Sequence, residues 1–188
     1  GEEAARRACG AVLDGLKGAQ PGAFEAGGRA LLALNNREDA VGGAVVELCR
    51  EDATRTSSFV EVVLQILNDN SFPNVDEAEC SGCLKVFKDI FGDPDTADMM
   101  YTNDTNVLLE MVLRELGDLP EKHAMRARFV EVLHMLLLNS SWGEQRFRRE
   151  EVAKCVDMLM KMGEEGCGIQ CQEALEDLLK DCCFLLEE

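Results

Sequence analysis

The sequence predicts an all-α protein, an armadillo/HEAT-like α-solenoid of about eight or nine helices, on three observations. Apolar residues make up 46% of the chain and aromatic residues only 5%, and the abundant Leu, Val, Ala and Met suit helix cores better than strand faces. Apolar and polar residues never alternate for longer than four or five positions, which argues against strands. A leucine-rich run ending in asparagine recurs along the chain, as in stacked helical repeats.

The chain is long enough for one domain with a sizeable core and too short for two full ones. We therefore expect residues 1–188 to form a single armadillo-like helical domain. Thirty-six acidic residues against nineteen basic ones give a net charge of −17, which would repel a phosphate backbone, so we expect no nucleic acid partner. No apolar run reaches the roughly 18 to 20 residues of a membrane span, so we expect no membrane insertion.

Glycine, proline and short polar clusters divide the first half of the chain into helices, because such residues end or start helices. A turn at 18–22 ends the first helix, and a polar corner at 35–38 precedes the third. The pair Gly42 and Gly43 is expected to weaken the third helix and to allow close packing. The helices expected here span residues 2–17, 23–34, 39–50, 56–67 and 75–91.

The second half begins with a short helical turn at residues 95–100, followed by the only tyrosine, Tyr101. Thr102, Asn103 and Asp104 come next, and then an apolar run at helical spacing. Small polar side chains accept hydrogen bonds from the first free amides of a helix, so we expect these three residues to cap the next helix. That helix is expected to end near residue 117, and the later ones to span 121–138, 143–162 and 169–186.

Internal repetition is the main sign of stacking. Residues 59–68, FVEVVLQILN, resemble residues 129–139, FVEVLHMLLLN, and residues 31–35, LLALN, echo the end of both. The final asparagines are separated by about one and two helical-repeat lengths. Units of that length, each ending a buried helix with a leucine-rich run, are typical of armadillo and HEAT repeats, so we favour a short solenoid over a closed bundle.

Residues that could carry chemistry are present, but not in useful arrangements. The nine cysteines are an odd number on apolar helical faces, which is typical of small buried side chains in the reducing cytosol. Cys80 and Cys83 have CxxC spacing, but a zinc site needs two further ligands. The two histidines, His123 and His134, have no catalytic partner at helical spacing. We therefore expect no enzyme activity, metal or cofactor.

Charge is unevenly distributed along the chain. Residues 114–162 contain nine basic and eight acidic residues, which leaves ten basic and twenty-eight acidic residues elsewhere. Arginine together with tryptophan is typical of interface hot spots. One interpretation is a partner-binding patch, and the other is solvated helix faces with the tryptophan filling a corner between helices. The residues of the predicted patch are Arg126, Arg128, Trp142, Arg146, Arg148 and Arg149.

A family resemblance centres on the run YTND at residues 101–104, which is followed by an amphipathic helix that contains an arginine. The segments EVVLQILN at 61–68 and LKVFKDIF at 84–91 precede it. Together these residues resemble the C-terminal armadillo-like domain of the WISH (Nck-interacting SH3 adaptor) family and its fungal Dip relatives, over roughly residues 28–160. The motif residues, expected to be mainly structural, are Tyr101, Thr102, Asn103, Asp104 and Arg114.

The resemblance implies an actin-cytoskeletal regulator without covalent chemistry of its own. Members of this family bind the Arp2/3 complex and activate it without a preformed filament, so that it seeds linear actin filaments. For this chain the resemblance implies the Arp2/3 complex as partner, actin as an indirect partner, and a cytoplasmic location at the actin cortex or patches. The alternative is a non-catalytic helical scaffold or adaptor subunit that docks in a larger assembly without activating it.

Overall fold

The computed structural model describes residues 2–37 and 40–186, and every regular element in these ranges is an α-helix, which confirms the all-α prediction. Within those ranges, no helix combines the length and the apolar character that crossing a bilayer requires. In chain order the helices are α1 (Glu2–Leu16), α2 (Pro21–Asn35), α3 (Ala40–Arg50), α4 (Ala53–Asp69), α5 (Glu77–Phe91), α6 (Pro94–Ala97), α7 (Thr102–Asp118), α8 (Met125–Asn139), α9 (Trp142–Gln145), α10 (Arg149–Cys167) and α11 (Ile169–Leu186).

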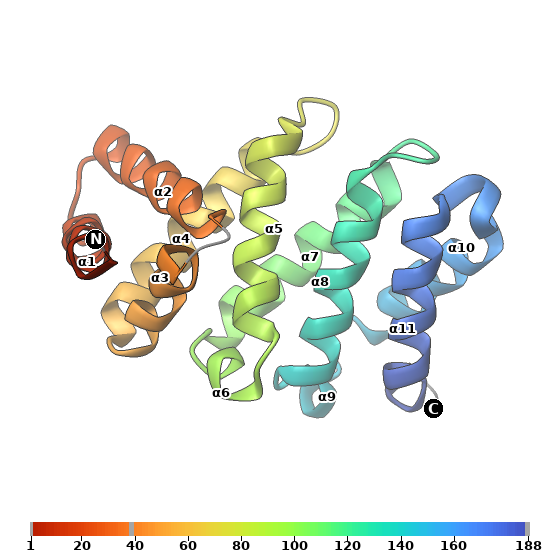
Figure 1. Cartoon of the computed structure of the whole chain (residues 1–188). Coiled ribbons are helices and arrows are strands. Elements are labelled where there is room, and N and C mark those ends of the chain that lie inside the picture. Colours follow the sequence, from red (N-terminus) through yellow and green to blue (C-terminus); the bar gives the residue numbers. More distant parts are fainter. Residues whose placement is uncertain (1, 38–39, 187–188) are drawn as a thin grey trace.

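The helices stack side by side into an α-solenoid that runs from α1 at one end to α10 and α11 at the other (Figure 1). We name two layers. The front layer consists of α2, α5, α8 and α11, and each of these helices contacts the next. The back layer consists of α4, α7 and α10, which also contact one another in sequence. The predicted solenoid is therefore confirmed.

Three-helix units repeat along the stack. After the pair α1 and α2, the chain forms the units α3–α4–α5, α6–α7–α8 and α9–α10–α11. Each unit consists of a shorter helix, a back-layer helix and a front-layer helix, and α4, α7 and α10 contact the front-layer helix that follows them. Units of two or three helices are typical of HEAT and armadillo repeats. In such a stack, contacts are made mainly between neighbouring units.

The front-layer helices run parallel, and polar contacts fix their relative positions. Between α2 and α5, and again between α5 and α8, later residues of one helix contact later residues of the next, which is the order that parallel helices produce. The direction of α8 and α11 in Figure 1 is also the same. The contacting pairs are Arg29–Glu79 (2.5 Å), Asn35–Asp89 (2.9 Å), Lys88–Glu131 (2.7 Å), Asn139–Phe91 carbonyl (2.7 Å) and His134–Asp181 (3.1 Å).

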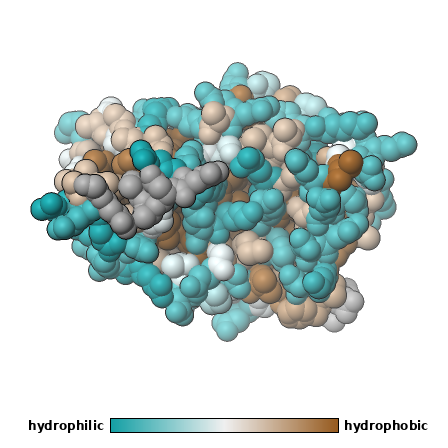
Figure 2. Space-filling view, viewed as in Figure 1, coloured by the Kyte–Doolittle hydropathy of each residue, from teal (hydrophilic) through white to brown (hydrophobic). Residues whose placement is uncertain are grey.

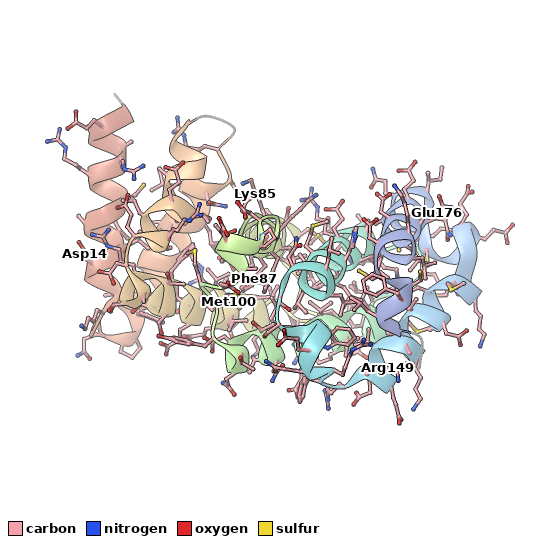
Figure 3. The ribbon with its side chains drawn as sticks, turned by 90° about the horizontal axis from the view of Figure 1, so that it is seen from below. Asp14, Lys85, Phe87, Met100, Arg149 and Glu176 are labelled. Atoms are coloured by element: carbon pink, nitrogen blue, oxygen red, sulfur yellow. The ribbon has the colours of Figure 1, made fainter. Side chains whose placement is uncertain are left out.

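One apolar core lies between the two layers. Phe59, Phe87, Phe91 and Phe129 are at most 2% exposed and come from α4, α5 and α8. Seen from below in Figure 3, Phe87 and Met100 lie between the two edges of the molecule. Burial of these side chains removes a large apolar area from water, which is the main favourable term in folding.

Close helix packing occurs at a glycine of α2 and not at the predicted glycine of α3. A Cβ atom on Gly28 would lie 2.5 Å from Cγ2 of Val62, so only glycine lets α2 approach α4 this closely. A Cβ atom on Gly43 would meet no atom within 4 Å. The prediction of close packing at Gly43 is therefore wrong, and Gly42 lies outside the residues whose surroundings the structure describes.

Several helix boundaries differ from the predicted ones. Eleven helices occur in the described ranges instead of eight or nine, partly because α6 and α9 are separate helices of one turn. The segment predicted as one helix at 143–162 is broken, since Arg146 and Arg148 have φ values of 55° and 52° in the left-handed region. The helix predicted from residue 121 begins only at Met125. Asp39, the predicted start of the third helix, lies outside the described residues.

The sequence repeat does not align equivalent helices. Residues 59–68 lie on α4 in the back layer, whereas residues 129–139 span most of α8 in the front layer. Most residues of both segments are buried, and this shared burial favours leucine-rich sequences in both. The shorter match at residues 31–35 does correspond in position to the end of α8. Those residues end α2, and α2 and α8 are both front-layer helices. The repeat therefore indicated stacking correctly but gave the wrong register.

Candidate docking surface

Arg126 lies inside the molecule, at the start of α8, with 1% of its surface exposed. Its guanidinium group donates hydrogen bonds to three backbone carbonyls at the end of α7 and in the following loop: Leu116 (2.6 Å), Leu119 and Pro120 (3.1 Å). The last carbonyls of a helix have no partner within it, so this side chain satisfies groups that would otherwise be buried without one. Arg126 is a structural residue, and its predicted place in a surface patch is wrong.

Trp142 is also buried, with 2% of its surface exposed. It begins α9, and its indole Nε1 donates to the carbonyl oxygen of Phe147 at 2.8 Å. The indole ring therefore fills the corner between α8, α9 and α10, as in the second of the two interpretations. A partner cannot use this side chain as a surface anchor while the fold is intact.

Arg146 connects α9 to the end of α11. Its Nε donates to the carbonyl of Gly143 at 2.8 Å, and a terminal nitrogen donates to the carbonyl of Leu185. Its guanidinium carbon lies 5.9 Å from the centre of the Trp142 ring, which is within cation–π range. Arg146 is half-buried, and these contacts show that it mainly joins α9 to the end of α11.

Arg148 is exposed and belongs to the back layer. It pairs with Glu110 of α7 at 3.5 Å and with Glu151 of α10 at 3.1 Å. It also lines a groove of about 510 Å³ between α4 and α7. Arg149 follows it and is half-buried. In Figure 3, Arg149 lies towards the edge opposite to Lys85 of the front layer.

Arg128 is exposed on the front layer, one turn into α8. It makes no hydrogen bond and no ion pair with any residue between 2–37 or 40–186. The other front-layer cations near it are paired, Lys85 with Asp89 at 2.6 Å and Lys88 with Glu131 at 2.7 Å. The structure thus gathers Trp142 and the arginines after it around the α9–α10 corner, and it separates Arg128 from them.

Two adjoining grooves run along the front layer. The first, of about 240 Å³, lies between α5 and α8, and the second, of about 580 Å³, lies between α8 and α11. Arg128 lines both. Figure 2 shows that this face is mainly hydrophilic with small scattered hydrophobic areas. Among the residues lining the larger groove are Ala124, Ala127, Arg128, Glu173, Ala174 and Asp177.

Sequence reasoning missed the wall that α11 contributes to this groove. Glu173 and Asp177 are four residues apart and therefore lie on one face of the helix. Ala174 lies between them and Ala127 lies on α8, and small residues at facing positions leave a hollow between two helices. The spacing of alanines and acids could be found in the sequence, but pairing α11 with α8 required the fold.

The tyrosine-led motif starts α7, but without the predicted caps. Tyr101 occupies the N-cap position, is 59% exposed and makes no capping bond through its side chain. Thr102 is the first helical residue, so its hydroxyl cannot serve as the N-cap acceptor. Asp104 lies in the first turn, where burial raises the pKa of its carboxyl group. The prediction that Thr102, Asn103 and Asp104 cap this helix is therefore wrong.

Arg114, the last motif residue, joins α7 to α4. Its guanidinium group donates to the side-chain oxygen of Asn68 at 3.3 Å and to the hydroxyl of Ser71 at 2.6 Å. It also pairs with the buried carboxylate of Glu115 at 3.2 Å. That carboxylate in turn accepts a hydrogen bond from the amide of Phe72 at 3.0 Å. Arg114 therefore fixes the loop between α4 and α5 against the back layer.

Seven of the nine cysteines are buried packing residues, whereas Cys155 is half-buried and Cys183 is exposed. Cys80 and Cys83 are fully buried in α5. Burial raises the pKa of the Cys80 thiol to about 12 and that of the Cys171 thiol to about 12. A thiol with so high a pKa stays protonated and unreactive at neutral pH. Within the part of the chain that the structure describes, no group of three or more His, Cys, Asp or Glu side chains could hold a metal ion.

Stacked helical units whose parallel front-layer helices leave open grooves between them define a helical repeat protein. A family model described as SPIN90/Ldb17, leucine-rich domain, matches residues 27–152, which is more than half of the chain. The chain therefore belongs to the SPIN90/Ldb17 leucine-rich domain family, and the resemblance to the WISH and Dip proteins is confirmed. Membership indicates an actin-related, adaptor-type protein, and the family is not a known enzyme family. The match runs from within α2 to the start of α10, so it leaves out α1 and α11.

Proposed function

We propose that this protein binds the Arp2/3 complex and activates it without a preformed filament, so that the complex seeds linear actin filaments. The observation that carries the proposal is the family match over α2 to α10, the region that builds most of the front layer. The grooved front face supports it with a surface suited to a protein partner. This activity would place the protein in the cytoplasm, at the actin cortex or actin patches.

The solenoid would act as a rigid template. A multisubunit partner that exchanges between inactive and active arrangements is shifted toward the arrangement that the protein binds more tightly. The shift cannot exceed the difference in binding free energy between the two arrangements, and a shift from 1:99 to 99:1 requires about 5.5 kcal/mol. The continuous core and the bonded front-layer joints hold the docking face in one geometry, so little binding energy is lost in ordering it.

A polymerisation assay tests the proposed activity. The full chain is mixed with purified Arp2/3 complex and pyrene-labelled actin monomers, without filaments or other activators. We expect a shorter lag before assembly that depends on both proteins, and microscopy should show unbranched filaments. Actin with the protein alone is the control. An unchanged lag over a range of protein concentrations would contradict activation.

We further propose that α7 to α10 form part of the contact surface, with Arg148 as its exposed back-layer cation. Arg148→Glu should weaken binding to the Arp2/3 complex, because it reverses a charge that remains accessible at the surface. Lys17→Glu is the matched control, since this exposed side chain lies directly after α1, outside the proposed contact surface. Equal affinity of the two variants would remove Arg148 from the contact. Arg146 and Arg149 are poorer test positions, because they are half-buried at the α9–α10 corner.

The scaffold alternative makes a different prediction in the same experiment. A scaffold or adaptor subunit would bind the complex, as measured by fluorescence anisotropy or sedimentation, without shortening the lag. Binding with acceleration supports the activator, and binding without acceleration supports the scaffold.

A further inference from the structure

We propose that the groove between α8 and α11 binds a helical segment of the partner that carries a carboxylate on one edge and a lysine or arginine on the other. The inference rests on the proposed function and adds the chemistry of the segment that is recognised. The α8 wall of the groove carries Arg128 and Glu131, and Glu131 is paired with Lys88 of α5, so Arg128 is the unpaired charge on that side. The α11 wall carries Glu173 and Asp177. Charges of opposite sign thus line opposite sides of one hollow.

The register of the two helices brings these charges to the same level. His134 of α8 contacts Asp181 of α11 at 3.1 Å. Both helices rise about 1.5 Å per residue in the same direction, so moving six residues back along each places Arg128 level with Leu175. That level lies midway between Glu173 and Asp177, which both line the groove.

The charges nevertheless remain unpaired. Arg128, Glu173 and Asp177 form no ion pair with one another or with any other residue in the described ranges. Elsewhere on this face, cations are neutralised by nearby carboxylates, as in Lys88–Glu131 at 2.7 Å. Besides the pair Lys88–Glu131, the groove therefore holds one unpaired cation and two unpaired carboxylates, which lie too far apart to form ion pairs with one another. A ligand that presents the opposite charge to each wall would pair with both.

The floor of the groove admits a bulky segment. Ala124, Ala127 and Ala174 line it, and these methyl side chains leave a volume of about 580 Å³. The lining residues of α8 run from Ala124 to Met135, which corresponds to roughly 16 Å or three helical turns. A partner helix of about eleven residues would fill this length, with apolar side chains over the alanines.

A helical occupant fits better than an extended one. The groove is lined by side chains of α8 and α11, and the backbone groups of these helices already bond within each helix. An extended segment would find no backbone partners here and would lose its hydrogen bonds to water on burial. A helix carries its own backbone bonds and presents residues three and four positions apart to the groove.

Half of this site lies outside the residues matched by the family model, which end at residue 152. The acidic wall is contributed by α11, Ile169–Leu186. The acidic residues that would select a segment with a basic edge therefore lie on a helix outside the matched region.

The experiment measures the affinity of the purified Arp2/3 complex for the full chain and its variants. Arg128→Glu, the double variant Glu173→Lys with Asp177→Lys, and Ala124→Trp, which fills the groove, should each weaken binding about tenfold or more. The matched controls are Lys17→Glu, the double variant Glu3→Lys with Glu61→Lys, and Ala4→Trp, which make the same changes at exposed positions outside the groove and outside α7 to α10. Controls should stay within about twofold of the unmodified protein. Circular dichroism verifies that every variant is folded.

The outcomes separate the two proposals. If the unmodified chain does not bind the complex, the proposed function and this inference both fail. If it binds and the groove variants bind equally well, the inference alone fails. A photo-cross-linker at position 124, followed by mass spectrometry, identifies the segment that enters the groove. A helical segment with a carboxylate and a basic side chain on opposite edges supports the inference, and an extended or uncharged segment overturns it.

Discussion

Arginine has opposite roles at two positions of the same helix turn. Arg126 is 1% exposed and bonded to three carbonyls, whereas Arg128 is exposed and bonded to none of the described residues. Two residues correspond to about 200° around a helix, so the side chains point in nearly opposite directions. Periodicity alone could show that the two arginines differ in environment. It could not show which of them is buried, because the carbonyls around Arg126 come from α7 and its loop.

The burial of Arg126 leads to a stability prediction. Arg126→Met should lower the free energy of unfolding by about 3 kcal/mol, because it leaves buried carbonyls without donors. Urea denaturation followed by circular dichroism measures the change. Arg128→Met is the control and should change the free energy of unfolding by less than about 0.5 kcal/mol. Similar effects at the two positions would contradict the structural role of Arg126.

At the scale of single elements, most helices could be predicted from the sequence, and the break that was missed has a tertiary cause. Gly and Pro marked the ends of α1 and α5 closely. The break between α9 and α10 was missed because Arg146 and Arg148 adopt left-handed conformations that the sequence QRFRRE does not demand. Contacts of Arg146 with the end of α11 hold that conformation. Such a break depends on tertiary contacts, so the local sequence pattern does not predict it.

The closest packing between two helices can be tested by size compensation. Gly28→Ala should destabilise the fold by about 1 to 3 kcal/mol, because the new methyl group would overlap Val62. Adding Val62→Ala should recover part of this loss, so that the double variant is more stable than the sum of the single effects. Gly43→Ala is the control and should stabilise by about 0.5 to 1 kcal/mol, since its surroundings are open. Strict additivity in urea denaturation would argue against the contact.

The start of α4 has a pH dependence that follows from its cap. The Asp52 carboxylate accepts a hydrogen bond from the amide of Thr54 at 2.7 Å, and this bond lowers the pKa of Asp52 below its usual value of 3.8. The folded state therefore favours the ionised form. The resulting stability is present above 3.8 and is lost as the pH falls through the lowered pKa.

We accordingly expect Asp52→Ala to melt at a lower temperature than the unmodified protein at neutral pH. The difference should shrink at a pH below that of the folded-state titration, where both proteins lack the charged cap. Thermal melts over an acid-to-neutral pH series provide the measurement. A difference in Tm that is independent of pH would show that Asp52 acts through something other than its charge.

At the scale of the whole molecule, composition and repetition were sufficient to predict the all-α solenoid, and the YTND motif together with the segments at 61–68 and 84–91 indicated the family. The candidate docking surface was harder to predict. Its walls come from Arg128 on α8 and from Glu173 and Asp177 on α11, which meet only because the front-layer helices are parallel and in register. Trp142 and Arg126, chosen for their residue type, are packed inside instead.

We propose that residues 1–188 form one domain, and unfolding can test this. Repeat stacks lose cooperativity when the contacts between units are weak. Here one apolar core passes through all units, so we expect a single transition in urea. Far-UV circular dichroism reports on all helices, and fluorescence of Trp142 reports on the unit α9–α10–α11. Coincident midpoints are expected, and an earlier fluorescence transition would show that this unit unfolds separately.

The parallel front layer has an electrostatic consequence for how a partner approaches. Each helix carries a macrodipole equivalent to about half a positive charge at its amino-terminal end and half a negative charge at its carboxyl-terminal end. Because α2, α5, α8 and α11 point the same way, these partial charges add along two opposite rims. The back-layer helices run the opposite way, so this polarity is a property of the front face and not of the whole molecule. A partner segment seated on this face therefore meets positive helix ends along one rim and negative helix ends along the other.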